Sequence, residues 1–172
     1  MEQYCGVDSG VGKVRDSVHF SRRCGKDLLD YGVYDRVLCD VPCFSDRHSV
    51  NSEDQNVFAQ RMIKNRLKLP QEQCDLLKAG LLYLKPGGSL VYSTCTLSPI
   101  QNEGVVNMAL KALWEETTHE FYVNDLTDAL KPFRFMCRIF GTKQGVKLGN
   151  LVVPSISNNF GPTYFCKITR KS

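Results

Sequence analysis

The chain lacks the features that mark membrane-spanning, secreted or zinc-binding proteins. None of its apolar runs is long enough to cross a bilayer, and residues 1–4 do not begin a signal peptide. It contains no C-x-x-C pair, and the nearest spacing, Cys39 and Cys43 on either side of Pro42, has no second pair to complete four zinc ligands. We therefore expect a soluble protein with no membrane contact and no structural metal site.

The composition fits one ordinary domain in a reducing compartment. The chain has 172 residues, of which 42% are hydrophobic, and this is enough for a real core. Its eight cysteines fall in predicted strands, strand ends and helices, whereas a secreted disulfide framework would be rich in loops. The net charge of +4 permits a nucleic-acid partner without demanding one.

A strand–helix–strand unit is predicted between residues 34 and 93. Residues 34–41 form a short apolar run that Pro42 stops, which is typical of a buried parallel strand. Residues 71–84 repeat leucines at helical spacing, and after a turn at 85–88 the β-branched and aromatic run 89–93 indicates a second strand. Such crossovers join parallel strands, so the two carboxyl ends lie side by side if the strands are adjacent. Ligands of open α/β sheets bind at that edge.

Cys43 and Cys95 each follow one of these strands. Two thiols delivered to one sheet edge indicate covalent chemistry. A helix is predicted over residues 99–116, with Ser98 as N-cap and Gln101 completing an S-x-x-Q capping box. Its N-terminus favours a thiolate at Cys95, although a buried cysteine at a strand end fits the local pattern equally well.

The rest of the chain predicts strands to which no chemistry is assigned. Residues 135–140, 148–153 and 163–169 have the pattern of three strands, and the last two are expected to be antiparallel. Trp114, late on the predicted helix, is expected to pack against the core. The predicted fold class is therefore α/β, with a mostly parallel sheet and an antiparallel strand near its end.

Several short motifs occur in order along the chain. They are residues 40–43, 46–48, 69–71, 85–88, 91–98, 101–103 and 159–164. Over residues 14–168 this set resembles the NSUN family of RNA cytosine-C5 methyltransferases, and residues 46–49 and the C-terminal segment are most similar to its mitochondrial ribosomal-RNA member. An ordered set of this kind is far more specific than one short pattern.

The resemblance implies a Rossmann-like fold that uses S-adenosylmethionine to methylate carbon 5 of cytosine in RNA. It assigns Cys95 as the nucleophile that forms a covalent adduct, and Cys43 as the residue that helps to release the product. The chemistry explains the need for both, because thiolate addition to carbon 6 activates carbon 5 and the new bond must later be broken. The resemblance implies that Asp40 contacts S-adenosylmethionine near its methionine part. Gly25 matches the glycine of a residue pair that lies near the adenine in the family. A turn carboxylate that closes the strand end explains Asp40 equally well.

Parts of the family pattern are absent. The glycine-rich turn that cradles the cofactor and the acidic residue that grips its ribose have no counterpart in the chain. We expect residues 14–172 to be the C-terminal part of the catalytic domain with its first strands missing, and residues 1–13 to be a flexible N-terminal segment. A truncated, non-catalytic protein that binds RNA or a protein partner is the alternative.

RNA contacts are predicted at basic residues beside Cys43 and before Pro70. These residues are Arg47, His48, Arg61, Lys64, Arg66 and Lys68. They could hold phosphates, although an ordinary solvated face explains each of them as well. The resemblance further implies mitochondrial ribosomal RNA as the substrate, mitochondria as the location, and a partner related to mitochondrial transcription termination factors.

Overall fold

The computed structural model describes residues 24–27, 31–43, 63–155 and 160–172. The predicted flexible segment 1–13 and the motif at residues 46–48 lie outside the described residues. None of the helices in the described ranges combines the length and the apolar character that crossing a membrane requires.

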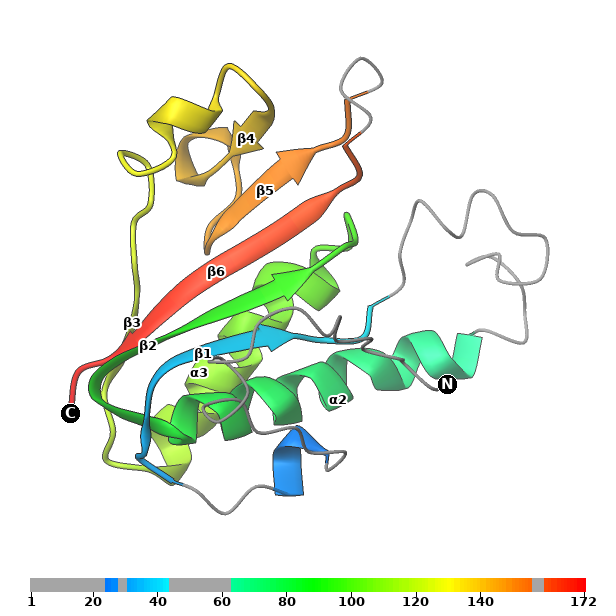
Figure 1. Ribbon diagram of the computed structural model, residues 1–172. Coiled ribbons are helices and arrows are strands. Elements are labelled where there is room, and N and C mark those ends of the chain that lie inside the picture. Colours follow the sequence, from blue (N-terminus) through cyan, green and yellow to red (C-terminus); the bar gives the residue numbers. More distant parts are fainter. Residues whose placement is uncertain (1–23, 28–30, 44–62, 156–159) are drawn as a thin grey trace, which may run out of the picture.

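The described strands form one mixed sheet in the order β1-β2-β6-β5-β4, and β3 pairs with β6 (Figure 1). The strands are β1 Tyr34–Asp40, β2 Leu84–Thr94, β3 Phe121–Val123, β4 Arg138–Phe140, β5 Asn150–Val153 and β6 Thr163–Arg170. β1 and β2 are parallel, and the other pairings are antiparallel. The α/β class and the antiparallel strand near the end are confirmed, and antiparallel pairing is more extensive than predicted.

The position of β6 explains the extra antiparallel pairing. β6 lies between β2 and β5 and runs against both of them. β1, β2 and β5 therefore run in one direction, and their carboxyl ends share one edge of the sheet. We call this edge the carboxyl edge.

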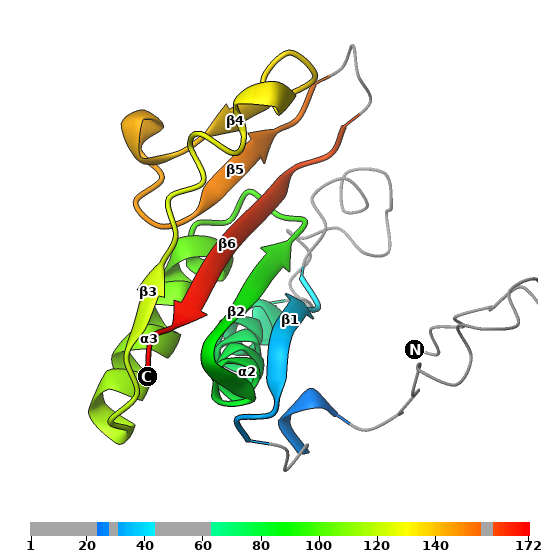
Figure 2. The ribbon, with the colours of Figure 1, turned by 60° about the vertical axis from the view of Figure 1, so that its left-hand side comes forward.

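Two helices cover one face of the sheet (Figure 2). They are α2, Ile63–Leu82, and α3, Val105–Glu116. The core lies between these helices and the facing side chains of β2 and β6. Its fully buried members include Leu77, Leu81, Leu90, Tyr92, Val105, Val106, Ala109, Leu113, Tyr164, Cys166 and Ile168. The face of α3 that packs against the sheet is therefore apolar. Four short helical segments complete the part of the chain that the structure describes: η2 Gly25–Asp27, η4 Ile100–Gly104, η5 Lys131–Phe133 and η6 Thr142–Gln144.

Two element boundaries differ from the prediction between residues 63 and 94. α2 begins at Ile63 and contains Pro70, which removes one backbone hydrogen bond without ending the helix. β2 begins at Leu84 because residues 85–88 form a bulge, so that Tyr34 pairs with Leu84 and Arg36 pairs with Ser89. Glycine suits this bulge, since a Cβ at Gly88 would lie 2.9 Å from the backbone carbonyl oxygen of Lys85.

Two predictions beyond β2 are corrected, and one strand was not predicted. The strand expected at residues 135–140 begins only at Arg138, and Phe135 is 85% exposed. Trp114 was expected to pack against the core, but it is 77% exposed. β3 is a short strand that the sequence pattern did not indicate.

The core of α2 can be tested with a matched pair of substitutions on the same helix. Leu77 is completely buried, whereas Leu67 is 77% exposed. Leu77→Ala should lower the free energy of unfolding by about 2–5 kcal/mol, because it removes buried methyl groups and leaves a cavity. Leu67→Ala should change it by less than about 0.5 kcal/mol in the same urea titration. Equal losses in the two variants would contradict the packing described here.

Candidate active site

Cys43 and Cys95 are in direct contact at the carboxyl edge. The parallel pairing of β1 with β2 places Asp40 opposite Ser93, and each cysteine follows shortly after its strand. The two Sγ atoms are 2.6 Å apart, which is longer than a disulfide bond of about 2.05 Å. The backbone N–H of Cys95 also donates to Cys43 Sγ at 3.0 Å. The expected meeting of the two strand ends is confirmed.

The Cys43 thiol stays protonated at neutral pH. Burial raises the pKa of Cys43 to about 12, and the side-chain hydrogen bond with Cys95 acts in the same direction. Cys95 itself is exposed. The pair therefore combines an accessible sulfur with a neighbouring thiol that keeps a proton to donate.

Asn102 is hydrogen-bonded to the residues on both sides of Cys95, to the Thr94 side chain and to the Thr96 backbone. Thr94 Oγ1 donates to Asn102 Oδ1 at 2.5 Å, and Asn102 Nδ2 donates to the Thr96 carbonyl at 2.9 Å. Asn102 is buried and has non-helical backbone angles, φ −97° and ψ −106°, which kink the chain within η4. The helical segment begins at Ile100 with Pro99 as N-cap and without a side-chain cap hydrogen bond, so the predicted capping box is wrong. The amide of Asn102 fixes the turn that carries Cys95.

Gln73 ties the turn of Cys43 to the segment after Cys95. This α2 side chain is completely buried, and its Nε2 donates to the Pro42 carbonyl at 2.8 Å and to Gln101 Oε1 at 3.1 Å. Tyr92 Oη donates to the Gln101 carbonyl at 2.7 Å, so this segment is also anchored to β2. Gln73 Oε1 has no hydrogen-bond partner within the described residues.

Asp40 and Gly25, the predicted cofactor contacts, lie at opposite ends of β1. Asp40 is exposed at the carboxyl end, where Ser93 Oγ donates to Asp40 Oδ1 at 2.9 Å. The Gly25 carbonyl accepts from Tyr83 Oη at 2.7 Å, and the Tyr83 ring packs against Tyr34 at the start of β1. The structure brings Asp40 to the cysteines and leaves Gly25 away from them.

The predicted RNA contacts are only partly described. Lys64, Arg66 and Lys68 lie in the first turns of α2, and Arg47, His48 and Arg61 lie outside the described residues. No group of three or more His, Cys, Asp or Glu side chains in the described part of the chain is placed to hold a metal ion.

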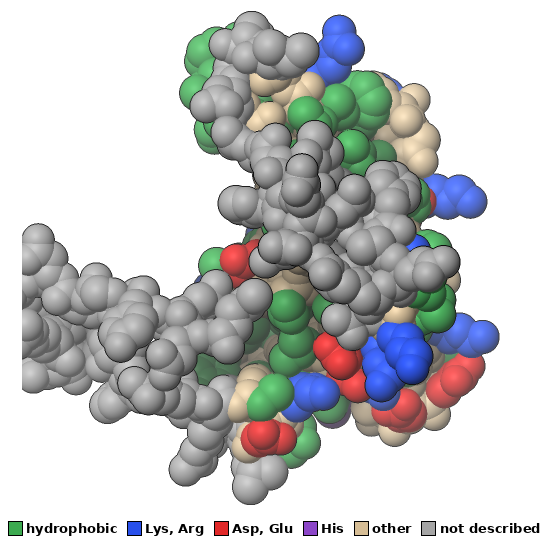
Figure 3. All heavy atoms as spheres, turned by 90° about the vertical axis from the view of Figure 1, so that its right-hand side faces the viewer, with side chains coloured by type: hydrophobic (Ala, Val, Ile, Leu, Met, Phe, Trp, Pro, Cys, Tyr) green, Lys and Arg blue, Asp and Glu red, His purple; other side chains and the backbone are tan. Residues whose placement is uncertain are grey.

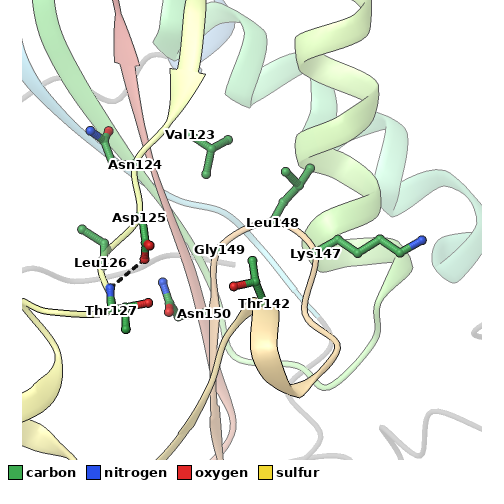
Figure 4. Close-up of a pocket in the computed structure, with 10 residues that line it drawn as sticks. All are labelled: Val123, Asn124, Asp125, Leu126, Thr127, Thr142, Lys147, Leu148, Gly149 and Asn150. Atoms are coloured by element: carbon green, nitrogen blue, oxygen red, sulfur yellow. Dashed lines mark hydrogen bonds between the residues drawn. The ribbon is translucent and has the colours of Figure 1, made fainter.

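A cavity of about 230 Å³ lies apart from the two cysteines, between the end of β3 and the start of β5 (Figure 4). Its lining includes Asn124, Asp125, Thr127, Lys147 and Asn150. The Thr127 N–H donates to Asp125 Oδ1 at 2.8 Å, and hydrogen bonding to Thr127 lowers the pKa of Asp125. None of the predicted site residues lines this cavity.

Comparison with known proteins identifies the family. The family model described as 16S rRNA methyltransferase RsmB/F matches residues 7–146. The chain belongs to the RsmB/F family. Its carboxyl edge, with the cysteine pair and Asp40, is therefore the edge of a methyltransferase sheet.

Curated relatives of this RsmB/F chain carry names of RNA-modifying enzymes. The 5-cytosine rRNA methyltransferase NSUN4 of Bos taurus is 44% identical over 158 residues, covering 92% of the chain and 40% of that protein. The 5-cytosine rRNA methyltransferase nsun-4 of Caenorhabditis elegans is 42% identical over 149 residues, covering 82% and 30%. A mitochondrial tRNA (cytosine(34)-C(5))-methyltransferase of Mus musculus is 34% identical over 148 residues, covering 85% and 40%. The chain thus spans at most 40% of the length of these relatives.

Solved structures support the same fold. A methyltransferase homolog protein from Pyrococcus horikoshii has a TM-score of 0.50 and 27% identity, covering 81% of this chain and 40% of that one. The structure of NSun6 from Pyrococcus horikoshii with SFG has a TM-score of 0.51 and 21% identity, covering 88% and 34%. The methyltransferase fold class predicted for the RsmB/F chain is confirmed.

The supporting residues Gln73 and Asn102 were not predicted. Both are polar side chains on positions that face inward among apolar neighbours, Gln73 beside Cys74 and Leu77 and Asn102 before Val105. A polar residue on the buried face of a helix must find a hydrogen-bond partner, and this was the signal available in the sequence.

Gln73 can be tested against Gln71, which is exposed on the same helix and donates to Asp75 Oδ1. Gln73→Ala should lower the free energy of unfolding by about 1–3 kcal/mol, because the Pro42 carbonyl and Gln101 lose their buried donor. It should also slow diamide-induced formation of a Cys43–Cys95 disulfide, measured by peptide mass spectrometry. Gln71→Ala should change neither quantity. Unaltered disulfide formation in Gln73→Ala would show that Gln73 does not hold the turn of Cys43 in place.

The raised pKa of Cys43 predicts its reactivity with pH. In the folded chain the rate of Cys43 alkylation by iodoacetamide should keep rising above pH 9, because its pKa is about 12. In the urea-unfolded chain the rate should reach half its maximum near pH 8.5, the ordinary thiol pKa, and level off by about pH 10. Since the folded pKa exceeds the unfolded one, this thiol stabilises the fold below about pH 8.5 and the contribution is lost toward pH 12. A plateau below pH 9 in the folded chain would disprove the shift.

Proposed function

We propose that this chain carries the catalytic edge of an enzyme that methylates carbon 5 of cytosine in RNA through a covalent adduct with Cys95. The observation that carries the proposal is the contact between Cys95 and the protonated thiol of Cys43, at the carboxyl edge of an RsmB/F sheet. S-adenosylmethionine supplies the methyl group as a sulfonium.

Cys95 forms and later breaks a bond to carbon 6 of the base. Its thiolate adds to carbon 6, and the displaced electron pair makes carbon 5 nucleophilic enough to accept a methyl group. After methylation, the carbon 5 proton leaves, its bonding pair restores the ring double bond, and the pair of the carbon–sulfur bond returns to Cys95. The exposed position of Cys95 leaves room for a base that has left its stack.

Cys43 assists the release step as a proton donor. Its thiol touches Cys95 Sγ, so it is placed to protonate the sulfur as the carbon–sulfur bond breaks. In the same step the Cys43 sulfur accepts the proton that leaves carbon 5, whose bonding pair restores the double bond and expels Cys95, so the Cys43 thiol is regenerated.

Asp40 fits a contact to the methionine part of S-adenosylmethionine. Its carboxylate is exposed beside the cysteines and is oriented by Ser93, which suits an ammonium group. Gly25, which lies beside Tyr83 and Leu76 and away from the cysteines, stays a proposed contact near the adenine of the same cofactor. The neighbouring structure determined with SFG, an S-adenosylmethionine analogue, supports the choice of cofactor.

The names of the relatives support ribosomal RNA as the substrate and mitochondria as the location. Lys64, Arg66 and Lys68 on the first turns of α2 are proposed phosphate contacts, together with Arg47, His48 and Arg61. A partner related to mitochondrial transcription termination factors remains a prediction of the family resemblance.

The two cysteine roles predict opposite effects on the RNA–protein adduct. With RNA and S-adenosylmethionine present, Cys43→Ala should let the adduct accumulate, because methylation continues while release is slowed. Cys95→Ala should abolish the adduct, alone or combined with Cys43→Ala. The measurement is the amount of RNA-shifted protein on a denaturing gel.

Cys24→Ala is the matched control, since Cys24 is an exposed cysteine outside the site. It should leave the adduct at the level of the unsubstituted chain. Accumulation in Cys95→Ala instead of Cys43→Ala would reverse the roles. RNA binding without an adduct in any variant would favour the non-catalytic alternative.

A further inference from the structure

Aromatic and basic side chains gather on the segment that leads into β4. Phe135 is 85% exposed and Phe133 is 52% exposed, although large aromatic side chains usually gain free energy from burial. Arg134 and Arg138 are also exposed and flank Phe135 along the chain. We call Phe133, Arg134, Phe135 and Arg138 the aromatic–arginine cluster.

The cluster borders a hollow of its own. The hollow has a volume of about 350 Å³, and Arg134, Phe135 and Arg138 line it together with Pro154. Within the described residues neither guanidinium has an ion-pair partner, whereas nearby Lys131 is paired with Asp128. Two uncompensated positive charges beside an exposed ring complement a polyanion that carries flat bases.

The sheet places this hollow on the same edge as the cysteines. Arg138 opens β4 opposite Val153, the last residue of β5, and β5 ends at the carboxyl edge. The order β2-β6-β5-β4 separates β4 from β2 by three strand spacings, or roughly 15 Å at about 4.8 Å each. Figure 3 faces this edge and shows hydrophobic and basic side chains together at its upper end, where β4 and β5 lie.

We propose that the aromatic–arginine cluster binds single-stranded RNA a few nucleotides away from the target cytosine. The Phe135 ring stacks on a base, and Arg134 and Arg138 contact phosphates of the same strand. The inference rests on the proposed function, because it takes RNA to be the molecule at the carboxyl edge. The separation matches the length of strand that single-stranded nucleic-acid sites usually cover.

The stacking role is tested by the affinity of the full chain for RNA. The probe is a fluorescein-labelled single-stranded RNA of about 12 nucleotides with one cytosine, measured by fluorescence anisotropy. Phe135→Ala should weaken binding roughly 10-fold, the effect of losing one base stack, and Phe135→Trp should retain it. Trp114→Ala is the control, since it removes an equally exposed aromatic ring near the far end of α3, away from the carboxyl edge.

The phosphate contacts are tested by the salt dependence of the same affinity. Arg138→Gln should reduce the slope of log K against log salt concentration by about 0.7, the value for one phosphate contact on a single strand. Lys111→Gln should leave the slope unchanged, because Lys111 lies on α3 beside Glu115. A general disturbance of the fold would not lower the salt dependence by the value of one phosphate contact in Arg138→Gln alone.

Unchanged RNA affinity in Phe135→Ala would overturn the inference, and so would absence of RNA binding by the unsubstituted chain. An effect of Phe135→Ala only on capture of a protein partner would assign the cluster to that partner and likewise overturn it. Phe135→Ala could lower RNA affinity although the unsubstituted chain forms no cysteine adduct. That result would support RNA binding by the aromatic–arginine cluster and contradict the proposed reaction. Equal urea midpoints for all variants would show that these exposed substitutions leave the fold intact.

Discussion

The parallel pairing of β1 with β2 is the constraint on which the site depends. It sets Asp40 opposite Ser93 and delivers Cys43 and Cys95 to the same edge, where their sulfur atoms touch. A slip of one residue would turn each side chain of β1 to the opposite face and separate these pairs. The bulge at residues 85–88 lies at the start of the pairing, so the irregular part of β2 is kept away from the cysteines.

The pairing of β1 with β2 does not by itself fix the two turns that carry the cysteines. Buried side-chain amides hold these turns in place. Asn102 bridges the residues before and after Cys95, and Gln73 joins the turn of Cys43 to the segment behind Cys95. Both amides are buried while Cys95 is exposed. The supporting hydrogen bonds thus lie where water does not compete, and the sulfur of Cys95, which we propose as the nucleophile, is exposed. This division suits a nucleophile that must be accessible and also well positioned.

The sequence predicted the meeting of the cysteines because the signals are local: Pro42 stops β1, and an aromatic, β-branched run precedes Cys95. The roles of Gln73 and Asn102 depend on partners in other elements, which no local pattern reveals. The β-propensity around Phe135 predicted a longer strand, but pairing with β5 begins only at Arg138. The predicted strand therefore included Phe135, whose ring we propose as an RNA contact.

We propose that Cys95, and not the Cys43 in contact with it, forms the covalent bond to the base. Peptide mapping tests this assignment most directly. The Cys43→Ala variant would be incubated with RNA and S-adenosylmethionine, digested with nuclease and protease, and its adduct located by tandem mass spectrometry. We expect a methylated cytidine nucleotide attached to Cys95. A nucleotide attached to any other residue, in a variant that still methylates RNA, would contradict it.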